Sequence, residues 1–169
     1  MVGESGSQMV TWEEARDLLE AAFEYMAALP DSERGFLAAG YGRRMTSWPE
    51  VVRDMLSDYA DVDAQPSVQL TRKRAALVER MLTGERPLAN AIPEGHRALV
   101  GTVCAMRLWP RGEPFSWTAV FIALDGKLWS VRDRCERKVT ADAMRKAYER
   151  AIGKLTVALD LQVNGFANA

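Results

Sequence analysis

The fold is decided by residues 140–165, TADAMRKAYERAIGKLTVALDLQVNG. The hydroxyl of Thr140 can cap the start of a helix, and Asn164-Gly165 is a common helix ending. Between these signals, apolar residues recur at steps of three and four: Met144, Ala147, Tyr148, Ala151, Ile152, Leu155, Ala158 and Leu159. This spacing predicts a long amphipathic helix that buries one stripe against the rest of the chain.

Capping residues and helical spacing also predict helices upstream. Thr11 and Glu14 form a capping box, and Val10 is placed to act as a hydrophobic staple. By such signals, we expect helices over residues 11–29, 48–59, 71–82, 94–109 and 117–124. No stretch alternates as a half-buried strand does, and no hairpin dipeptide stands out. The predicted fold class is therefore all-α, a helical bundle.

Charge divides the chain into two parts. Residues 1–66 contain 13 Asp and Glu against 5 Arg and Lys, a net charge of -8, whereas residues 67–169 contain 10 against 17, a net charge of +7. We expect a disordered tail over residues 1–10, an acidic helical region over 11–66 and a basic domain over 67–169. The basic domain suits a polyanion, and the acidic region suits solvent or a protein partner.

The composition argues against several classes of function. Cys104, Cys135 and His96 are the only cysteines and histidine, so they cannot form a zinc cluster. No nucleophile stands at a known motif spacing from His96, so we expect a non-enzymatic protein without a cofactor. No apolar run approaches the roughly 18 residues of a membrane span, and no secretory signal precedes the fold. We therefore expect a cytoplasmic protein without a membrane partner and with reduced thiols.

Residues 92–155 have the order of a helix-turn-helix: a helix, a short capped helix, then a capped helix with basic residues near its start. This segment resembles the promoter-binding C-terminal domain of bacterial sigma factors. The matching residues are Pro93-Glu94, Arg97, Leu99-Val100, Ser116-Trp117, Val120, Leu124, Thr140, Met144, Arg150-Ala151 and Lys154-Leu155. Residues 48–54 (WPEVVRD) after a Gly-Tyr-Gly loop are similar to an uncharacterised family of short phage and prophage proteins. Together the resemblances imply a phage-type DNA-binding protein with a C-terminal helix-turn-helix.

Residues 125–139 form an insert that lengthens the link between the last two helices by about a dozen residues relative to a standard helix-turn-helix. Phe121 occupies a position where the sigma-factor domain has a small residue. The insert is rich in Arg and Lys beside Leu128 and Trp129. Two interpretations stay open: a DNA-contacting wing, or a displaced recognition helix over residues 128–136. Trp129 is the one tryptophan in a basic context, where it could stack on a base.

The predicted DNA contacts lie on the insert and on the final helix: Lys127, Arg132, Arg134, Arg137, Lys138, Thr140, Arg145, Lys146 and Arg150. Arg145 and Lys146 follow Thr140 within two turns, where a recognition helix presents side chains to bases and phosphates. The helix dipole alone would favour cations at the opposite end of the helix. Their position therefore favours a DNA contact over a solvated helix face.

Three functions fit these features. The first is a transcription regulator that binds double-stranded DNA as a homo-oligomer, with the acidic helices making partner contacts. The second is a small terminase subunit that recognises viral DNA for packaging. The third is a protein-interaction module that uses its sigma-like helices to engage host RNA polymerase and needs no DNA contact, which the acidic half of the chain makes possible. Mass in solution separates them, because we expect a dimer, a ring of many subunits and a monomer, respectively.

Overall fold

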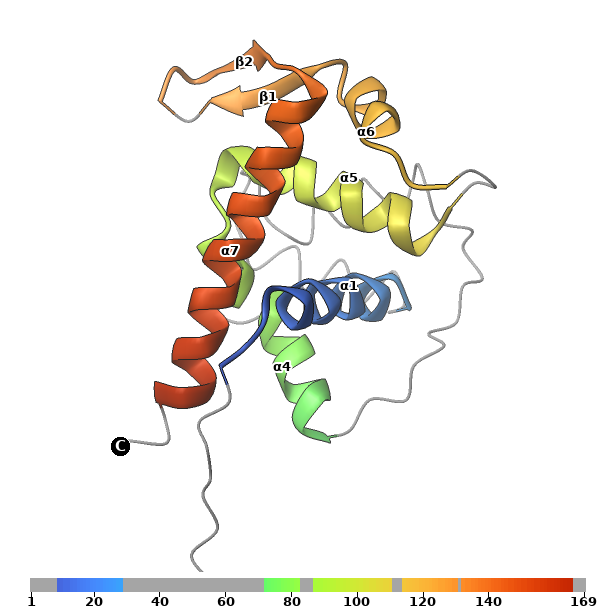
Figure 1. The fold of residues 1–169 in the computed structure, drawn as a ribbon. Coiled ribbons are helices and arrows are strands. Elements are labelled where there is room, and N and C mark those ends of the chain that lie inside the picture. Colours follow the sequence, from blue (N-terminus) through green and yellow to red (C-terminus); the bar gives the residue numbers. More distant parts are fainter. Residues whose placement is uncertain (1–8, 29–71, 83–86, 111–113, 131, 166–169) are drawn as a thin grey trace, which may run out of the picture.

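The computed structural model describes residues 9–28, 72–82, 87–110, 114–130 and 132–165, most of which are helical (Figure 1). The elements in chain order are α1 (Trp12–Ala28), α4 (Arg72–Leu82), η1 (Leu88–Ala91), η2 (Glu94–His96), α5 (Arg97–Leu108), α6 (Trp117–Ala123), β1 (Lys127–Ser130), β2 (Cys135–Lys138) and α7 (Ala141–Gly165). The elements η1 and η2 are short 3-10 helices. The helix predicted over residues 48–59 and the boundary near Pro66 lie outside the described residues.

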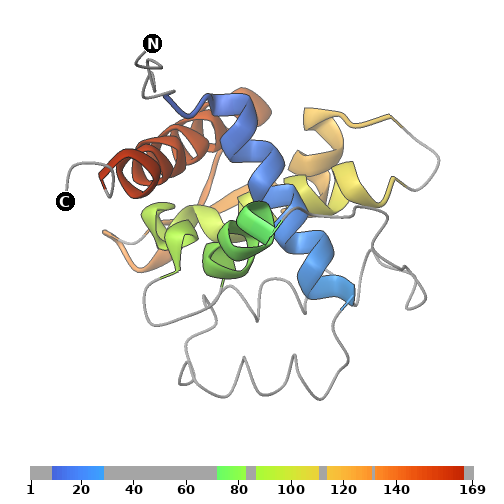
Figure 2. The ribbon, with the colours of Figure 1, turned by 90° about the horizontal axis from the view of Figure 1, so that it is seen from below.

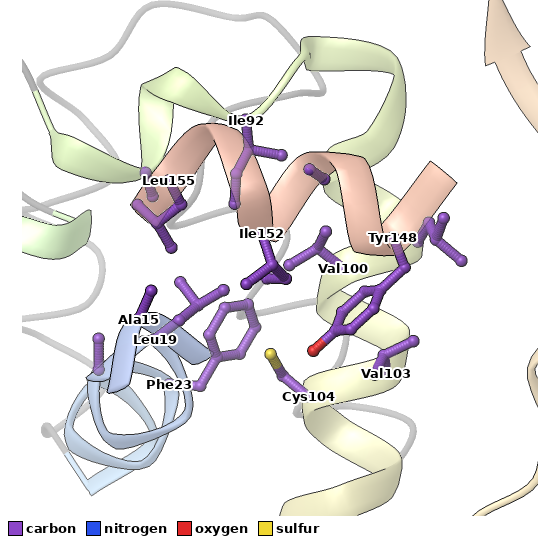
Figure 3. Close-up of a cluster of buried hydrophobic side chains, with 14 of the residues drawn as sticks. Ala15, Leu19, Phe23, Ile92, Val100, Val103, Cys104, Tyr148, Ile152 and Leu155 are labelled. Atoms are coloured by element: carbon purple, nitrogen blue, oxygen red, sulfur yellow. The ribbon is translucent and has the colours of Figure 1, made fainter. Parts of the chain in front are cut away.

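The core forms where α1, α5 and α7 meet. Figure 3 shows Leu19 and Phe23 of α1 beside Cys104 of α5 and Ile152 of α7, and all four side chains are buried. The predicted apolar stripe of α7 is buried as expected, except for Ala158, which is half-buried. Because α7 spans 25 residues, it packs against α1, α5, α6 and both 3-10 helices. None of the described helices combines the length and apolar character needed to cross a membrane.

Three predicted helix caps, at Thr11, Ser116 and Thr140, are present. The hydroxyl of Thr11 accepts from the Glu14 backbone N–H at 3.2 Å, and the Glu14 carboxylate accepts from the Thr11 N–H at 2.8 Å. Ser116 and Thr140 each accept from the backbone N–H three residues later, at 3.1 Å and 3.2 Å. Each cap satisfies donors that a helix start otherwise leaves unpaired, so α1, α6 and α7 begin where the sequence predicted.

The acidic helix α1 and the basic helices share one core. Val10 donates its backbone N–H to Asp160 of α7 at 3.1 Å, and the Trp12 indole donates to the Glu149 carbonyl at 3.4 Å. Arg107 of α5 forms an ion pair with Glu20 of α1. The described part of the acidic region is therefore packed directly against the C-terminal helix, and Val10, at the end of the expected tail, is held in place.

The described chain is mostly helical, as predicted, and departs from an all-α fold in one antiparallel hairpin, in which β1 and β2 pair Lys127 with Lys138 and Ser130 with Cys135. The predicted alternative of a helix over residues 128–136 is therefore wrong. In β1, Leu128 packs against the core while its neighbour Trp129 is exposed, the alternation that a strand requires. A strand of four residues is too short for this alternation to stand out in the sequence.

Candidate nucleic-acid interface

A tight turn fixes the base of the hairpin. Asp125 and Gly126 have φ angles of +51° and +62°, a left-handed conformation that glycine adopts freely and aspartate tolerates. Lys127 donates its backbone N–H to the Leu124 carbonyl at 2.9 Å. Val139 donates to the Gly126 carbonyl at 2.8 Å and closes the base of the hairpin. The hairpin therefore leaves α6 in a defined direction.

Contacts with the body of the protein hold the hairpin beside the start of α7. Strand β1 lies against η2, and Leu128 and Val139 pack against the core. A two-stranded hairpin is marginally stable by itself, so these contacts are what fix it. In Figure 1 the hairpin crosses the N-terminal end of α7 and extends beyond it to one side. The hairpin thus lies next to the N-terminal end of α7.

Four of the predicted DNA contacts form ion pairs with nearby carboxylates. The pairs are Lys127 with Asp125 (2.5 Å), Arg137 with Asp133 (2.7 Å), Arg145 with Asp142 (3.1 Å) and Lys146 with Asp142 (2.8 Å). The hydrogen bond from Lys146 holds the pKa of Asp142 below its usual value, so this carboxylate stays ionised at neutral pH. Exposed pairs exchange easily in water, but a phosphate must compete with the carboxylate for each of these cations.

A second set of cations forms no ion pair within the part of the chain that the structure describes: Arg132, Arg134 and Lys138 of the hairpin, with Arg150 and Lys154 of α7. All five side chains are exposed. Arg132 and Arg134 lie in the turn that joins β1 to β2. Arg150 and Lys154 are four residues apart and therefore share one face of α7. We refer to these five residues as the open cations.

Lys154 was not among the predicted contacts. The signal for it was available, since it lies one helical turn after Arg150. His96 of η2 is close to both residues: burial lowers the pKa of the imidazole below its usual value, and the charges of Arg150 and Lys154 lower the pKa further. Nδ1 of His96 is buried without a hydrogen-bond partner among the described residues. His96 is therefore neutral near pH 7, and its pKa responds to the charges of Arg150 and Lys154.

The two remaining candidates, Thr140 and Trp129, differ in how their side chains are placed. Thr140 uses its hydroxyl to cap α7, so its observed role is to define where the basic helix begins. Trp129 lies on β1 opposite Glu136 and is 45% exposed. Part of its ring is therefore accessible for stacking, as the sequence suggested.

This surface carries guanidinium and ammonium groups on the hairpin and on α7. Guanidinium and ammonium groups bind phosphate oxygens through charge-assisted hydrogen bonds. Within the described ranges, no group of three or more His, Cys, Asp or Glu side chains is arranged to hold a metal ion. Searches of protein-family models, curated proteins and solved structures found no match to this chain. Its function is therefore inferred from the geometry and charge of this surface.

Proposed function

We propose that this protein is a non-enzymatic, phage-type regulator that binds double-stranded DNA through the hairpin and the N-terminal half of α7. The observation that carries the proposal is the set of open cations defined above, which extends from the hairpin turn to the middle of α7. Cations without a carboxylate partner can replace the counterions of a phosphate backbone at little cost.

In the proposed binding mode, α6 and α7 are the two helices of a helix-turn-helix and the hairpin between them is a wing. Support comes from the packing of α6 against α7, where the rings of Trp117 and Tyr148 meet edge to face at 5.6 Å. The N-terminal half of α7 enters the major groove, and Arg150 and Lys154 contact the backbone that borders it. Arg132 and Arg134 at the hairpin turn contact the neighbouring backbone.

Three double variants test this mode: Arg150→Ala with Lys154→Ala, Arg132→Ala with Arg134→Ala, and Arg145→Ala with Lys146→Ala. Binding of a labelled duplex is measured by fluorescence anisotropy at several salt concentrations. Each of the first two variants should reduce the salt slope by about two, since each lost phosphate contact removes about one. The third should have a smaller effect, because Asp142 already balances these two cations.

The three variants change exposed side chains only, so thermal unfolding should show that all of them fold. If only the third variant weakens binding, the contacts lie in the first two turns of α7 and the open cations are not the interface. If none of the three changes the affinity or the salt slope, the DNA-binding proposal fails. A chain that binds RNA polymerase but no duplex would then favour the protein-interaction module.

One observation also favours self-association, which a terminase subunit would need. Val157 and Leu161 of α7 are 61% and 68% exposed and lie on one helix face. Mass in solution separates the two functions. A dimer supports the regulator, and a closed ring of many subunits supports genome packaging.

A further inference from the structure

The hairpin turns one of its two faces away from the body of the protein. Successive side chains of a strand point to opposite sides, so Leu128 faces the core and its neighbours Lys127 and Trp129 face away from it. The antiparallel register places Lys138 opposite Lys127 and Glu136 opposite Trp129. We refer to Lys127, Trp129, Glu136 and Lys138 as the outer face of the hairpin.

Trp129 lies outside the hydrophobic core. Among the described residues of the hairpin and its base, Leu128 and Val139 pack against the buried cluster and Trp129 does not. Its side chain is 45% exposed, so a large, flat aromatic surface stays in contact with water. Single exposed apolar residues are common on protein surfaces, and exposure by itself indicates no ligand. The charges around the ring indicate which ligand it suits.

Cations lie on both sides of Trp129 along the hairpin. Lys127 and Lys138 lie towards its base, and Arg132 and Arg134 lie in the turn at its tip. Lys127 and Lys138 are directly opposite each other, and such a pair of like charges destabilises two paired strands. Arg134 has a φ angle of +52°, a left-handed conformation that glycine adopts at lower cost. The hairpin therefore keeps cations at positions where other residues would make it more stable.

The turn that carries the two arginines is ordered by contacts within the hairpin. Ser130 donates its hydroxyl to the Asp133 carboxylate, which also forms an ion pair with Arg137 at 2.7 Å. By the alternation of the strands, Ser130 and Arg137 belong to the face opposite the outer face. Arg132 and Arg134, two of the open cations, are thus presented by a turn that is already in shape, which lowers the cost of binding an anion.

An unpaired DNA strand has the chemistry that fits the outer face. Its phosphates are anions that recur along the backbone, and its unpaired bases expose flat faces that stack on aromatic rings. The bases of an intact duplex stack on each other, so they offer no free face to Trp129. Glu136, opposite Trp129, repels phosphate, so the backbone is favoured at the cations on either side and a base is favoured over the ring.

We infer that the outer face of the hairpin binds an unpaired stretch of a DNA strand, with one base stacked on Trp129 and the flanking phosphates at Lys138 and at the arginines of the turn. The inference rests on the proposed function, in which α7 holds double-stranded DNA. Because the hairpin lies next to the N-terminal end of α7, the unpaired stretch directly adjoins the bound duplex. The ligand expected is therefore a duplex with a single-stranded or opened segment at its edge.

Matched DNA ligands test the inference with the full, unmodified chain. Fluorescence anisotropy compares a blunt duplex, the same duplex with a short single-stranded overhang, and the same overhang without bases. The wild type should bind the overhang with bases roughly 5- to 150-fold more tightly than the abasic overhang, which is the factor that stacking on one base contributes.

The ligand series separates the two proposals. Equal affinity for the two overhangs would overturn the inference and leave duplex binding in place. A chain that binds a free single strand with bases but no blunt duplex would overturn the proposed function and leave the hairpin site in place. A chain that binds none of these ligands would overturn both.

Two variants of Trp129 test the role of its ring. Trp129→Leu replaces the ring with an apolar side chain that does not stack, so the ratio of the two overhang affinities should fall to about one. The dependence of binding on salt should persist, because all the cations remain. Trp129→Phe keeps an aromatic ring and should retain part of the ratio. If Trp129→Leu keeps the wild-type ratio, or if it also reduces the salt slope as a displaced hairpin would, the stacking role is overturned.

Tyr25→Leu is the matched control, because it removes an exposed aromatic ring from another part of the molecule. Tyr25 belongs to α1 and is 39% exposed. Figure 1 shows α1 and the hairpin on opposite sides of α5, and Figure 2 views the molecule from the end that α1 and α4 occupy. Tyr25→Leu should keep the wild-type ratio of overhang affinities. An equal loss of this ratio in Tyr25→Leu and Trp129→Leu would overturn the assignment of the site to the hairpin.

Discussion

Gly126→Ala should destabilise the protein through two separate effects. Gly126 has a φ angle of +62°, and a left-handed conformation costs a residue with a side chain about 1–2 kcal/mol. An added Cβ would lie 2.8 Å from Cζ and 2.9 Å from Cε2 of the Phe121 ring. Because Phe121 packs against the core, its ring cannot move without disturbing other contacts, and such overpacking costs about 1–3 kcal/mol.

The two effects together should lower the free energy of unfolding by about 3 kcal/mol. For a chain of 169 residues, each kcal/mol corresponds to a change in melting temperature of roughly 2–4 °C, so a decrease of roughly 6–12 °C is expected. Urea denaturation and thermal unfolding, both followed by circular dichroism, measure the two quantities. Phe121→Leu in the same chain should remove most of the steric part and leave the conformational part.

Gly153→Ala is the control, since it is the same substitution in a helix with open space around the added methyl group. It should increase the free energy of unfolding by up to about 1 kcal/mol. The reasoning is refuted if Gly126→Ala costs less than about 1 kcal/mol, or if the two substitutions change stability in the same direction.

Three further predictions concern single side chains. Thr140→Ala removes the cap of α7 and should lower the free energy of unfolding by about 1 kcal/mol in urea, whereas Thr140→Ser should change it little. The pKa of His96 is lower in the folded than in the unfolded chain, so its contribution to stability is present above about pH 6.5 and is lost as the pH falls below that value. Stability of His96→Gln should therefore fall less on acidification, and an NMR titration that places the folded pKa of His96 above 6.5 would contradict this. Thiol labelling of the native chain should modify exposed Cys135 and spare Cys104, whose pKa is raised by burial, and mass spectrometry showing two labels without denaturant would disprove the burial of Cys104.

The described helices were predictable because their signals are local. A capping hydroxyl such as that of Thr140 acts within one turn, and an apolar period is visible in any window of about a dozen residues. The left-handed turn at Asp125-Gly126 is local in the same sense, because its backbone conformation follows from those two residue types. These features need no knowledge of the rest of the chain.

The hairpin and the charge pairing were not predictable in the same way. Strands β1 and β2 have four residues each, and β1 packs against η2, which lies about 30 residues earlier in the chain. Likewise, the sequence predicts both Arg145 and Arg150 as DNA contacts and does not distinguish them. Only the structure shows that Arg145 pairs with Asp142 and that Arg150 forms no ion pair within the described residues. Which cations stay open is a property of side-chain geometry.

The packing of α1 against α7 also has a consequence for how the chain folds during its synthesis. The hydrogen bonds from Val10 to Asp160 and from Trp12 to Glu149 join residues 150 and 137 positions apart. Of the described helices, α1 is synthesised first and α7 last. The apolar face of α1 therefore cannot pack against α7 until nearly the whole described chain has been translated. We expect the nascent chain to complete its core only after α7 has emerged from the ribosome, and a chaperone that shields α1 during translation should raise the yield of folded protein.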